Sequence, residues 1–412
     1  MSGTAPAGRT SAPGVPDPAA LFARRAEQFR PSPVRAVFEI AMRPGMISLA
    51  GGNPDTGALP HAVLAGTAAR LLAERGPEVL QYGSGAGIER LPELVCRLMD
   101  LEGAATDPGR IQITAGSQAG IDLVVKLFCD PGDVVVAEGP TYVGALGVFG
   151  SYEVAVSHVD VDDDGLDPEA VAERIDALRA AGRTVKLVYT VPTFHNPTGV
   201  TLSEERRRRL VAVCAERGVV VLEDDPYGLL GFDREHRLPS LYSLDPETVV
   251  HLGSFSKIFS PGLRVGWIAA SPAVRSRLQI AAEAVTIHPS VLGQELAAEY
   301  VGGEHWRPAL DRAVARYRSR CAAMMAALEE HMPEGVRWTR PAGGFFTWLD
   351  LDPARAHGDL LHRAIDHGVV VVPGGACYAD ARPSTSLRLA FSAAAEEDIA
   401  EGVRRLGRML RA

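Results

Sequence analysis

Lysine is scarce in this chain. Of its 42 basic residues only three are lysines, namely Lys126, Lys186 and Lys257, and the rest are arginines. Arginine stays protonated in proteins and cannot act as an amine nucleophile. A reaction that needs a side-chain amine therefore has three candidate residues, and only Lys257 is flanked by serines.

Other features are absent too, and each absence excludes a class of protein. No apolar run approaches the length of a membrane-spanning helix, and the first thirty residues lack the apolar block of a secretory signal. The net charge of −9 argues against a nucleic-acid partner. The five cysteines are scattered, without zinc-site or disulfide spacing. We therefore expect a cytoplasmic protein with no metal site and no membrane or nucleic-acid partner.

The rest of the composition is that of a globular protein, with 46% hydrophobic and 23% charged residues. Residues 1–30 are rich in Ala, Pro and Gly and predict a flexible tail. From about residue 110 strand-like and helix-like segments alternate, which predicts a mostly parallel sheet covered on both faces. After about residue 290 a long helical stretch reaches about residue 330, and shorter elements follow. We predict a tail (1–30), an N-terminal arm with a large domain (31–290), and a smaller C-terminal α/β domain (291–412).

Polar segments follow or lie on several of the predicted strands. Ligand sites in such sheets lie beyond the carboxyl ends of the strands. Each segment alone has an ordinary structural explanation, such as a capping serine, a rigid turn or an exposed cation. They are Thr114–Gln118, Pro192–Gly199, Glu223–Tyr227, Gly253–Arg264 and Ser386–Phe391.

Together these segments supply one set of chemical groups. Lys257 is an amine that can accept an aldehyde, and two serines with Arg264 can hold a phosphate. Glu223–Asp225 offer a carboxylate for a cationic ring nitrogen, and Arg388 has the fork that binds a carboxylate. These are the groups needed to hold pyridoxal 5′-phosphate and an α-amino acid.

The order of the motifs GSQ, NPTG, DDPY, SFSK–SPGLRVG and SLRLAF resembles the class I/II aminotransferases of fold type I. The resemblance runs from about residue 32 to the C-terminus and is greatest to the branch of the 2-aminoadipate aminotransferases. It implies an α/β fold, that of the pyridoxal-phosphate-dependent transferases of fold type I. It also implies transfer of an α-amino group to a 2-oxo acid by a ping-pong mechanism, through a Schiff base on Lys257.

The resemblance also implies a role for individual residues. Lys257, Asp224 and Tyr227 are the expected catalytic residues, with Asp224 paired to the ring nitrogen. Cofactor contacts are expected from Ser117, Gln118, Tyr142, Asn196, Asp224, Tyr227, Ser254, Ser256, Lys257 and Arg264. Tyr82 is expected to reach the phosphate of a neighbouring subunit, which implies a homodimer with shared active sites. Substrate contacts are expected from Arg388, Gly52, Asn196 and Arg35.

Two alternatives stay open. The same quinonoid intermediate can lead to oxidation, hydroxylation or elimination of a specialised amino acid, because the residues that bind the cofactor would be the same. A regulator with an aminotransferase-like ligand domain would need a DNA-binding module, and only about thirty residues precede the resemblance. The sequence also differs from the usual family pattern at His195, Tyr378 and the glycine-rich segment 83–87, which leaves the substrate open.

Overall fold

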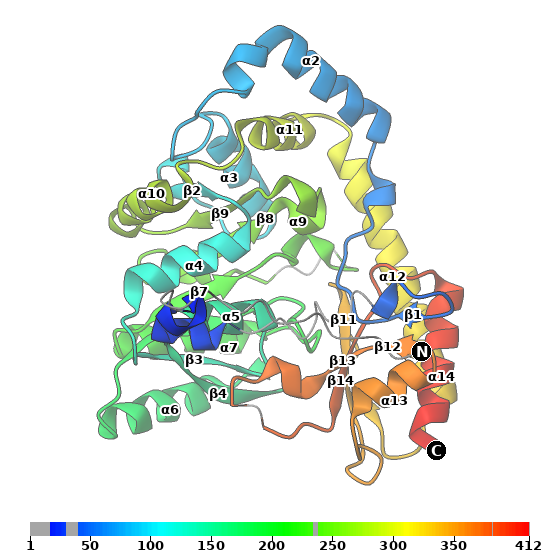
Figure 1. The fold of residues 1–412 in the computed structure, drawn as a ribbon. Coiled ribbons are helices and arrows are strands. Elements are labelled where there is room, and N and C mark those ends of the chain that lie inside the picture. The colour runs from blue at the N-terminus through cyan, green and yellow to red at the C-terminus, as the bar shows by residue number, and fades with distance from the viewer. Residues whose placement is uncertain (1–16, 30–39, 234–237, 381, 412) are drawn as a thin grey trace.

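The computed structural model describes residues 17–29, 40–233, 238–380 and 382–411. A large eight-stranded sheet occupies one part of the molecule, and a four-stranded sheet with its helices lies beside it (Figure 1). The architecture is α/β, as predicted from the alternation of strands and helices.

The large sheet has the strand order β2-β9-β8-β7-β6-β3-β4-β5. Strands β3, β4, β6, β7 and β8 are parallel, whereas β9 is antiparallel to β2 and β8, and β5 is antiparallel to β4. The prediction of a mostly parallel sheet is therefore confirmed. The strands are β2 (Ile111–Thr114), β3 (Val134–Gly139), β4 (Ala155–Asp162), β5 (Gly165–Leu166), β6 (Val185–Thr190), β7 (Val220–Asp224), β8 (Val249–Ser254) and β9 (Gly266–Ala269).

Helices cover both faces of this sheet (Figure 1). One layer contains α4 (Ser117–Phe128), α5 (Val143–Ser151) and α10 (Pro272–Thr286), and the other contains α6 (Pro168–Ala180), α7 (Glu204–Glu216) and α8 (Leu241–Leu244). Strands buried on both faces read as continuous runs of Val and Leu, and β3 and β8 are indeed buried at every position.

Chain direction brings the polar segments to one edge of the sheet. The carboxyl ends of β2, β3, β6, β7 and β8 meet there, and so does the start of the antiparallel β9. Short elements continue the chain at this edge, namely α9 (Phe255–Ile258), η5 (Gly228–Leu230) and η6 (Pro261–Leu263). The motif residues that follow these strands are therefore neighbours.

The second sheet has the order β10-β11-β14-β13. Its strands are β10 (Arg337–Trp338), β11 (Phe346–Asp350), β13 (Val372–Pro373) and β14 (Ser386–Ala390), with α13 (Leu360–Asp366), η7 (Gly374–Cys377) and α14 (Glu396–Arg411) in the same part of the chain. A short parallel pair joins β1 (Ile47–Ser48) to β12 (Val369–Val370), so an N-terminal segment packs with the C-terminal elements.

The single long helical stretch expected after residue 290 is two helices. They are α11 (Val291–Gly302) and α12 (Trp306–His331), separated at a glycine pair that interrupts helical structure. Helix α11 packs against α2 (His61–Val79) and α3 (Leu91–Leu101), and α12 packs against α14. The division of the chain into domains at residue 290 stays a prediction.

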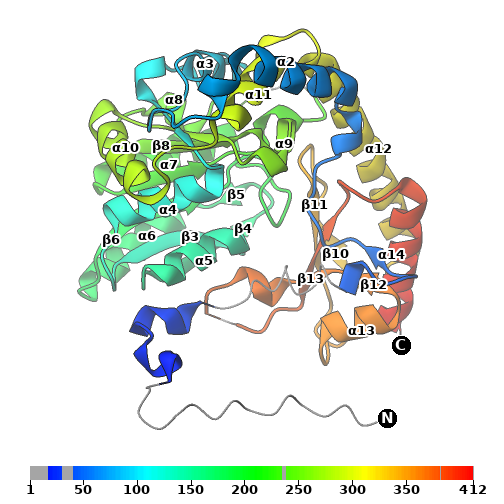
Figure 2. The ribbon, with the colours of Figure 1, turned by 45° about the horizontal axis from the view of Figure 1, so that its top comes forward.

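Part of the segment predicted as a flexible tail has regular turns. Residues 18–21 and 24–28 form the 3₁₀ helices η1 (Pro18–Leu21) and η2 (Arg24–Gln28), drawn in dark blue in Figure 2. Helix η2 contacts α5. An ion pair between Arg24 and Glu153 joins the two segments. The remaining short helices are η3 (Thr56–Ala58) and η4 (Pro108–Arg110). Within the described ranges, no helix has the length and apolar character that crossing a membrane requires.

Candidate active site

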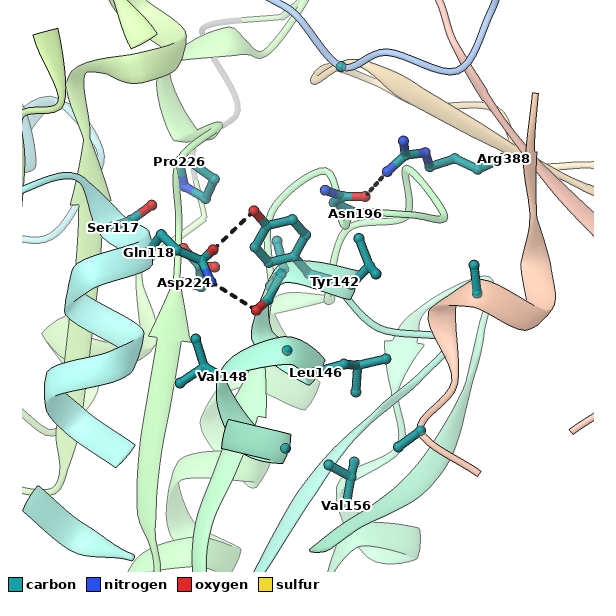
Figure 3. Close-up of a pocket in the computed structure, with 18 of the residues that line it drawn as sticks. Ser117, Gln118, Tyr142, Leu146, Val148, Val156, Asn196, Asp224, Pro226 and Arg388 are labelled. Carbon is teal, nitrogen blue, oxygen red and sulfur yellow. Dashed lines mark hydrogen bonds between the residues drawn. The ribbon is translucent and has the colours of Figure 1, made fainter. Parts of the chain in front are cut away.

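A cavity of about 1050 Å³ opens at the carboxyl edge of the large sheet, facing the second sheet. Its lining combines side chains from both parts of the chain (Figure 3). The predicted site residues found in this lining are Gly52, Ser117, Gln118, Tyr142, Asn196, Asp224, Tyr227, Ser254, Ser256, Lys257, Arg264 and Arg388.

Lys257 lies on α9, directly after β8, and its amine points into this cavity. The Nζ atom donates a hydrogen bond to the carbonyl oxygen of Gly52 at 3.1 Å. Burial lowers the pKa of the amine to about 8, and the positive charges of Arg388 and Arg264 act in the same direction. Since Lys126 and Lys186 do not line the cavity, Lys257 is the amine available to the site.

Asp224 ends β7 with its carboxylate in the cavity. Its Oδ2 atom accepts a hydrogen bond from the hydroxyl of Tyr189 at 2.8 Å, whereas Oδ1 has no protein partner among the described residues. Burial raises the pKa of Asp224 to about 6, and the hydrogen bond from Tyr189 opposes that rise. A buried carboxylate oxygen without a partner can accept a hydrogen bond from the N–H group of a protonated ring nitrogen.

Glu223 and Asp225, the acidic neighbours of Asp224 in the sequence, point away from it because side chains alternate along a strand. Glu223 turns to the other side, where it pairs with the ring of His251 at 3.0 Å and accepts the backbone N–H groups of residues 241 and 242. Burial disfavours the charge on His251, but the hydrogen bond and charge of Glu223 raise its pKa to about 9. Asp225 accepts a hydrogen bond from Thr193. The cations that compensate these carboxylates are therefore His251 and the buried Arg207.

An anion site lies at the start of α4. Gly116 precedes the helix with φ of +84°, a conformation that favours glycine, and a Cβ atom there would collide with the guanidinium of Arg264. Arg264 adopts a left-handed backbone conformation and donates to the hydroxyl of Ser256 at 3.4 Å. The N-terminus of a helix, two serines and an arginine together suit a phosphate dianion.

Tyr142 stands between this anion site and the second sheet (Figure 3). Its hydroxyl donates to Oε1 of Gln118 at 3.2 Å, and the Gln118 amide donates to the carbonyl of Gly144 at 2.8 Å. Burial raises the pKa of Tyr142, so the phenol stays neutral at physiological pH. The two hydrogen bonds fix the plane of the aromatic ring beside the cavity.

Arg388 lies on β14, between β11 and β13, and is only 3% exposed. The alternative explanation of an exposed cation on an edge strand is therefore wrong. Its guanidinium donates to Oδ1 of Asn196 at 2.9 Å and to the carbonyl of Ala50 at 2.7 Å, and it lies 4.3 Å from the ring centroid of Phe346. The Nε atom has no partner in the described part of the protein. This buried fork is available to a carboxylate.

His195 lies behind Asn196 and outside the cavity lining. Its Nδ1 is 2.7 Å from the hydroxyl of Thr198, and its Nε2 is 3.0 Å from the carboxylate of Glu138. The same carboxylate accepts hydrogen bonds from Thr190 and from the backbone of Val191. His195 is thus a neighbour of the site that stabilises the loop carrying Asn196.

One predicted site residue in the described part of the chain, Tyr82, is not brought to this cavity: it is 75% exposed and has an edge-to-face contact with His288. The predicted substrate contact Arg35 lies outside the described residues. Conversely, Tyr189 and Phe346 contact site residues but were not predicted. A tyrosine hydroxyl within a buried strand was a usable signal, whereas nothing in the local pattern around Phe346 distinguishes it from a core residue.

These groups fit pyridoxal 5′-phosphate. The cavity offers an amine of lowered pKa, an anion site, and a buried carboxylate oxygen without a partner. Among the described residues no cluster of His, Cys, Asp and Glu is arranged to hold a metal ion. The protein can therefore hold an anionic ring cofactor at the sheet edge and a carboxylate at Arg388.

Comparisons with known proteins agree with this assignment. The profile of the family "Aminotransferase class I and II" matches residues 44–406. Aromatic-amino-acid aminotransferase 1 of Thermococcus litoralis is 35% identical over 95% of this chain and 94% of its own length. The structure of a kynurenine aminotransferase of Pyrococcus horikoshii in complex with PMP has a TM-score of 0.89 and 37% identity, covering 96% of this chain and 98% of the other.

A third similar protein has the activity after which the 2-aminoadipate aminotransferase branch is named. The structure of LysN, an alpha-aminoadipate aminotransferase from Thermus thermophilus, has a TM-score of 0.88 and 36% identity. The match covers 96% of this chain and 98% of the other, and that structure holds N-(5′-phosphopyridoxyl)-L-leucine.

Proposed function

Because the chain belongs to the class I and II aminotransferases, with the fold type I architecture and pyridoxal 5′-phosphate as cofactor, we propose that it transfers amino groups through Lys257. The net reaction moves the amino group of an α-amino acid to a 2-oxo acid in a ping-pong cycle. The observation that carries this proposal is the placement of the Lys257 amine in one cavity with the anion site and Arg388.

Arg388, Asp224 and Lys257 each have a separate role in the proposed reaction. When bound, pyridoxal 5′-phosphate supplies the electron sink for the carbanion formed at Cα. Arg388 would bind the substrate carboxylate, and Asp224, whose Oδ1 has no partner among the described residues, would keep the ring nitrogen of the cofactor protonated. The Lys257 amine would be the base that takes the Cα proton, and a pKa of about 8 leaves part of this amine unprotonated near neutral pH.

The remaining assignments rest on the family pattern. Ser117, Ser254, Ser256 and Arg264 hold the phosphate, and Tyr142 stacks on the ring, with Tyr227 and Asn196 at its oxygen. The relatives are named as aminotransferases, which favours amino-group transfer over oxidation, hydroxylation or elimination. The five cysteines are free, which suits a reducing cytoplasm.

We further propose a homodimer in which Tyr82 reaches the phosphate of the neighbouring subunit. Exposed apolar side chains support a covered surface on this part of the chain, namely Leu80, Ile280, Val285 and Ile287. Arg35 is proposed to lie on the substrate side.

Replacement of Lys257 tests the proposed chemistry. Lys257→Ala should abolish both covalent attachment of the cofactor, read by borohydride reduction and peptide mass, and amino-group transfer to a 2-oxo acid. Lys126→Ala is the matched control and should leave both unchanged. Turnover by Lys257→Ala would overturn the proposal.

Mixed dimers test the shared site. Tyr82→Phe should weaken cofactor binding about tenfold, since a hydrogen bond to a charged group is lost. In a heterodimer of Tyr82→Phe with Lys257→Ala, one site would have both native residues and recover native affinity. If Tyr82 acted within its own subunit, no such recovery would occur.

A further inference from the structure

The cavity continues beyond Tyr142 as a groove between α5 and the segment Gly374–Asp380. Figure 3 shows Leu146 and Val156 lining this extension, away from Asp224 and Arg388. Small residues widen it, because a Cβ atom added at Gly147 would meet nothing within 4 Å. We call this extension the side-chain groove, lined by Leu146, Gly147, Val156, Ala376 and Ala379.

The side-chain groove is lined mainly by apolar residues, and the polar residues Gln28, Ser151 and Asp380 belong to the same cavity lining. The cations among the described lining residues are Lys257, Arg264 and Arg388, and all three belong to the cofactor and carboxylate contacts described above. Asp380 lines the rim of the groove, but its carboxylate is occupied by Arg382, with Nε 3.0 Å from Oδ1. The groove opens to solvent at Gly147 and Ala379, but its described lining offers no free cation to an acidic side chain and mostly apolar surface to an aliphatic one, so the groove suits an uncharged chain.

The outer wall of the groove crosses between the two sheets. The segment Gly374–Asp380 follows β13 of the second sheet, yet it bonds to a strand of the large sheet and to the loop after β3. The backbone N–H of Thr141 donates to the carbonyl of Cys377 at 2.9 Å. The N–H of Ala379 donates to Nε2 of His158, on β4, also at 2.9 Å.

His158 can make its two contacts in one protonation state only. Its Nδ1 is 2.7 Å from the carbonyl oxygen of Glu138, which can only accept, so Nδ1 carries the hydrogen. Its Nε2 receives the N–H of Ala379, so Nε2 carries none. The ring must therefore be neutral, in the Nδ1–H tautomer, to hold the wall in place.

Resting on the aminotransferase function proposed above, we propose that the side-chain groove binds the side chain of the substrate, and that His158 is the positioning residue for its wall. The substrate class is then α-amino acids with extended uncharged side chains. The reacting groups stay at Lys257 and Arg388, and the groove selects among substrates by the apolar surface that each one buries.

Protonation of His158 should release this wall. The groups that face the ring are Asp160, Asp380, Arg382, the ring of Tyr378 and the Glu138 carbonyl. Burial lowers the pKa of His158 below its usual value, although the Glu138 carbonyl and the two carboxylates oppose that shift. At a pH below that value, Nε2–H would face the N–H of Ala379, and the hydrogen bond would be lost.

A homologous series of substrates tests the groove. We would measure kcat/KM for 2-aminobutyrate, norvaline, norleucine and 2-aminooctanoate, with 2-aminoadipate as the charged comparison. Each buried methylene should raise kcat/KM about fourfold in the native protein. Gly147→Leu should lower kcat/KM for 2-aminooctanoate about tenfold and leave kcat/KM for 2-aminobutyrate unchanged, because the Leu side chain fills the groove.

Equal kcat/KM values along the series, or no effect of Gly147→Leu, would overturn the groove assignment. Loss of transfer with every substrate would instead contradict the proposed function.

Two variants of His158 separate positioning from packing. His158→Asn keeps a donor near the Nδ1 position but does not reach Ala379, and it should lower the ratio of kcat/KM for 2-aminooctanoate over 2-aminobutyrate about fivefold. His158→Gln places an amide oxygen near the Nε2 position and should restore the ratio. His362→Asn, at an exposed histidine of α13, is the matched control. A fall equal for both substrates, or no rescue by Gln, would overturn the role of His158.

Hydrogen exchange and pH supply readouts that do not depend on the variants' activity. The protection factors of the amides of the segment Gly374–Asp380, which correct for the intrinsic effect of pH on exchange, should fall in His158→Asn and in the native protein at acid pH, but not in His158→Gln. The native substrate ratio should fall as the pH drops through the pKa of His158, below about 6.5. Unchanged exchange, or a ratio independent of pH, would contradict the proposal.

Discussion

The two ends of the active-site cavity are built in different ways. At the cofactor end, charged and polar side chains follow the strands of the large sheet and are held by hydrogen bonds, as Asp224 is by Tyr189. In the side-chain groove, helix α5 and the segment Gly374–Asp380 provide apolar surface and small residues. Chemistry is therefore placed on the sheet edge, whereas the proposed selection among substrates lies between α5 and the segment Gly374–Asp380.

This difference predicts two kinds of mutational effect. Changes at the cofactor and carboxylate end should reduce catalysis by a similar factor for every substrate, because all substrates share the α-amino acid group. Changes in the groove should affect only the longer substrates.

Arg388→Met should have the largest effect. It removes the fork that binds the substrate carboxylate and leaves the oxygens of Asn196 and Ala50 without a donor. We expect kcat/KM to fall about a thousandfold, or about 4 kcal/mol, equally for short and long substrates. Cofactor binding, followed by absorbance, should persist. Arg340→Met, at an exposed arginine paired with Glu329, is the matched control. A loss that depends on side-chain length would contradict the separation of the two ends.

His251→Gln should change stability more than selectivity. The pair of His251 with Glu223 is fully buried beneath Asp224, and removing one partner of such a pair costs about 3 kcal/mol. Since the pKa of His251 is raised to about 9, its contribution is complete below the unfolded value of about 6.5 and is lost as the pH rises through 9.

Urea unfolding at several pH values measures this contribution. The native protein should exceed His251→Gln in stability most at about pH 6 and least at about pH 10, while the substrate ratio of the groove stays the same. His362→Gln, at an exposed histidine paired with Asp359, should cost much less at either pH. A difference that grows at alkaline pH would mean that the pair is not ionic.

Much of the cofactor end could be predicted from the sequence. Strands that alternate with helices place polar loops at one edge, so the order of the segments alone made Asn196, Asp224 and Lys257 expected neighbours. Their residue types are those that a phosphate and a cationic ring require. The direction of β9 could not be predicted, because an apolar run of four residues fits a parallel or an antiparallel strand equally well.

The groove could not be predicted in the same way. Leu146 and Val156 look like ordinary core residues, and only the packing of α5 against a segment more than two hundred residues away leaves space beside them. The setting of Arg388 likewise depends on Ala50 and Phe346, which are close in space but not in sequence. Local patterns indicate which groups do the chemistry, but long-range packing decides the shape around them.

Tyr189→Phe should have the smallest effect and tests how the cofactor end is held. The substitution removes only the hydroxyl that donates to Oδ2 of Asp224, and this bond opposes the rise in the carboxyl pKa that burial causes. Without it the pKa of Asp224 should rise further above about 6, and affinity for pyridoxal 5′-phosphate should fall about fivefold, or about 1 kcal/mol. The acid limb of the rate profile should move to higher pH, because a higher pH is then needed to ionise Asp224.

Tyr300→Phe is the matched control, since the hydroxyl of that buried tyrosine has no partner among the described residues. If Tyr189→Phe instead changed the ratio of long to short substrates and left the pH profile in place, the two ends of the cavity would be coupled, and their separate construction would not imply separate function.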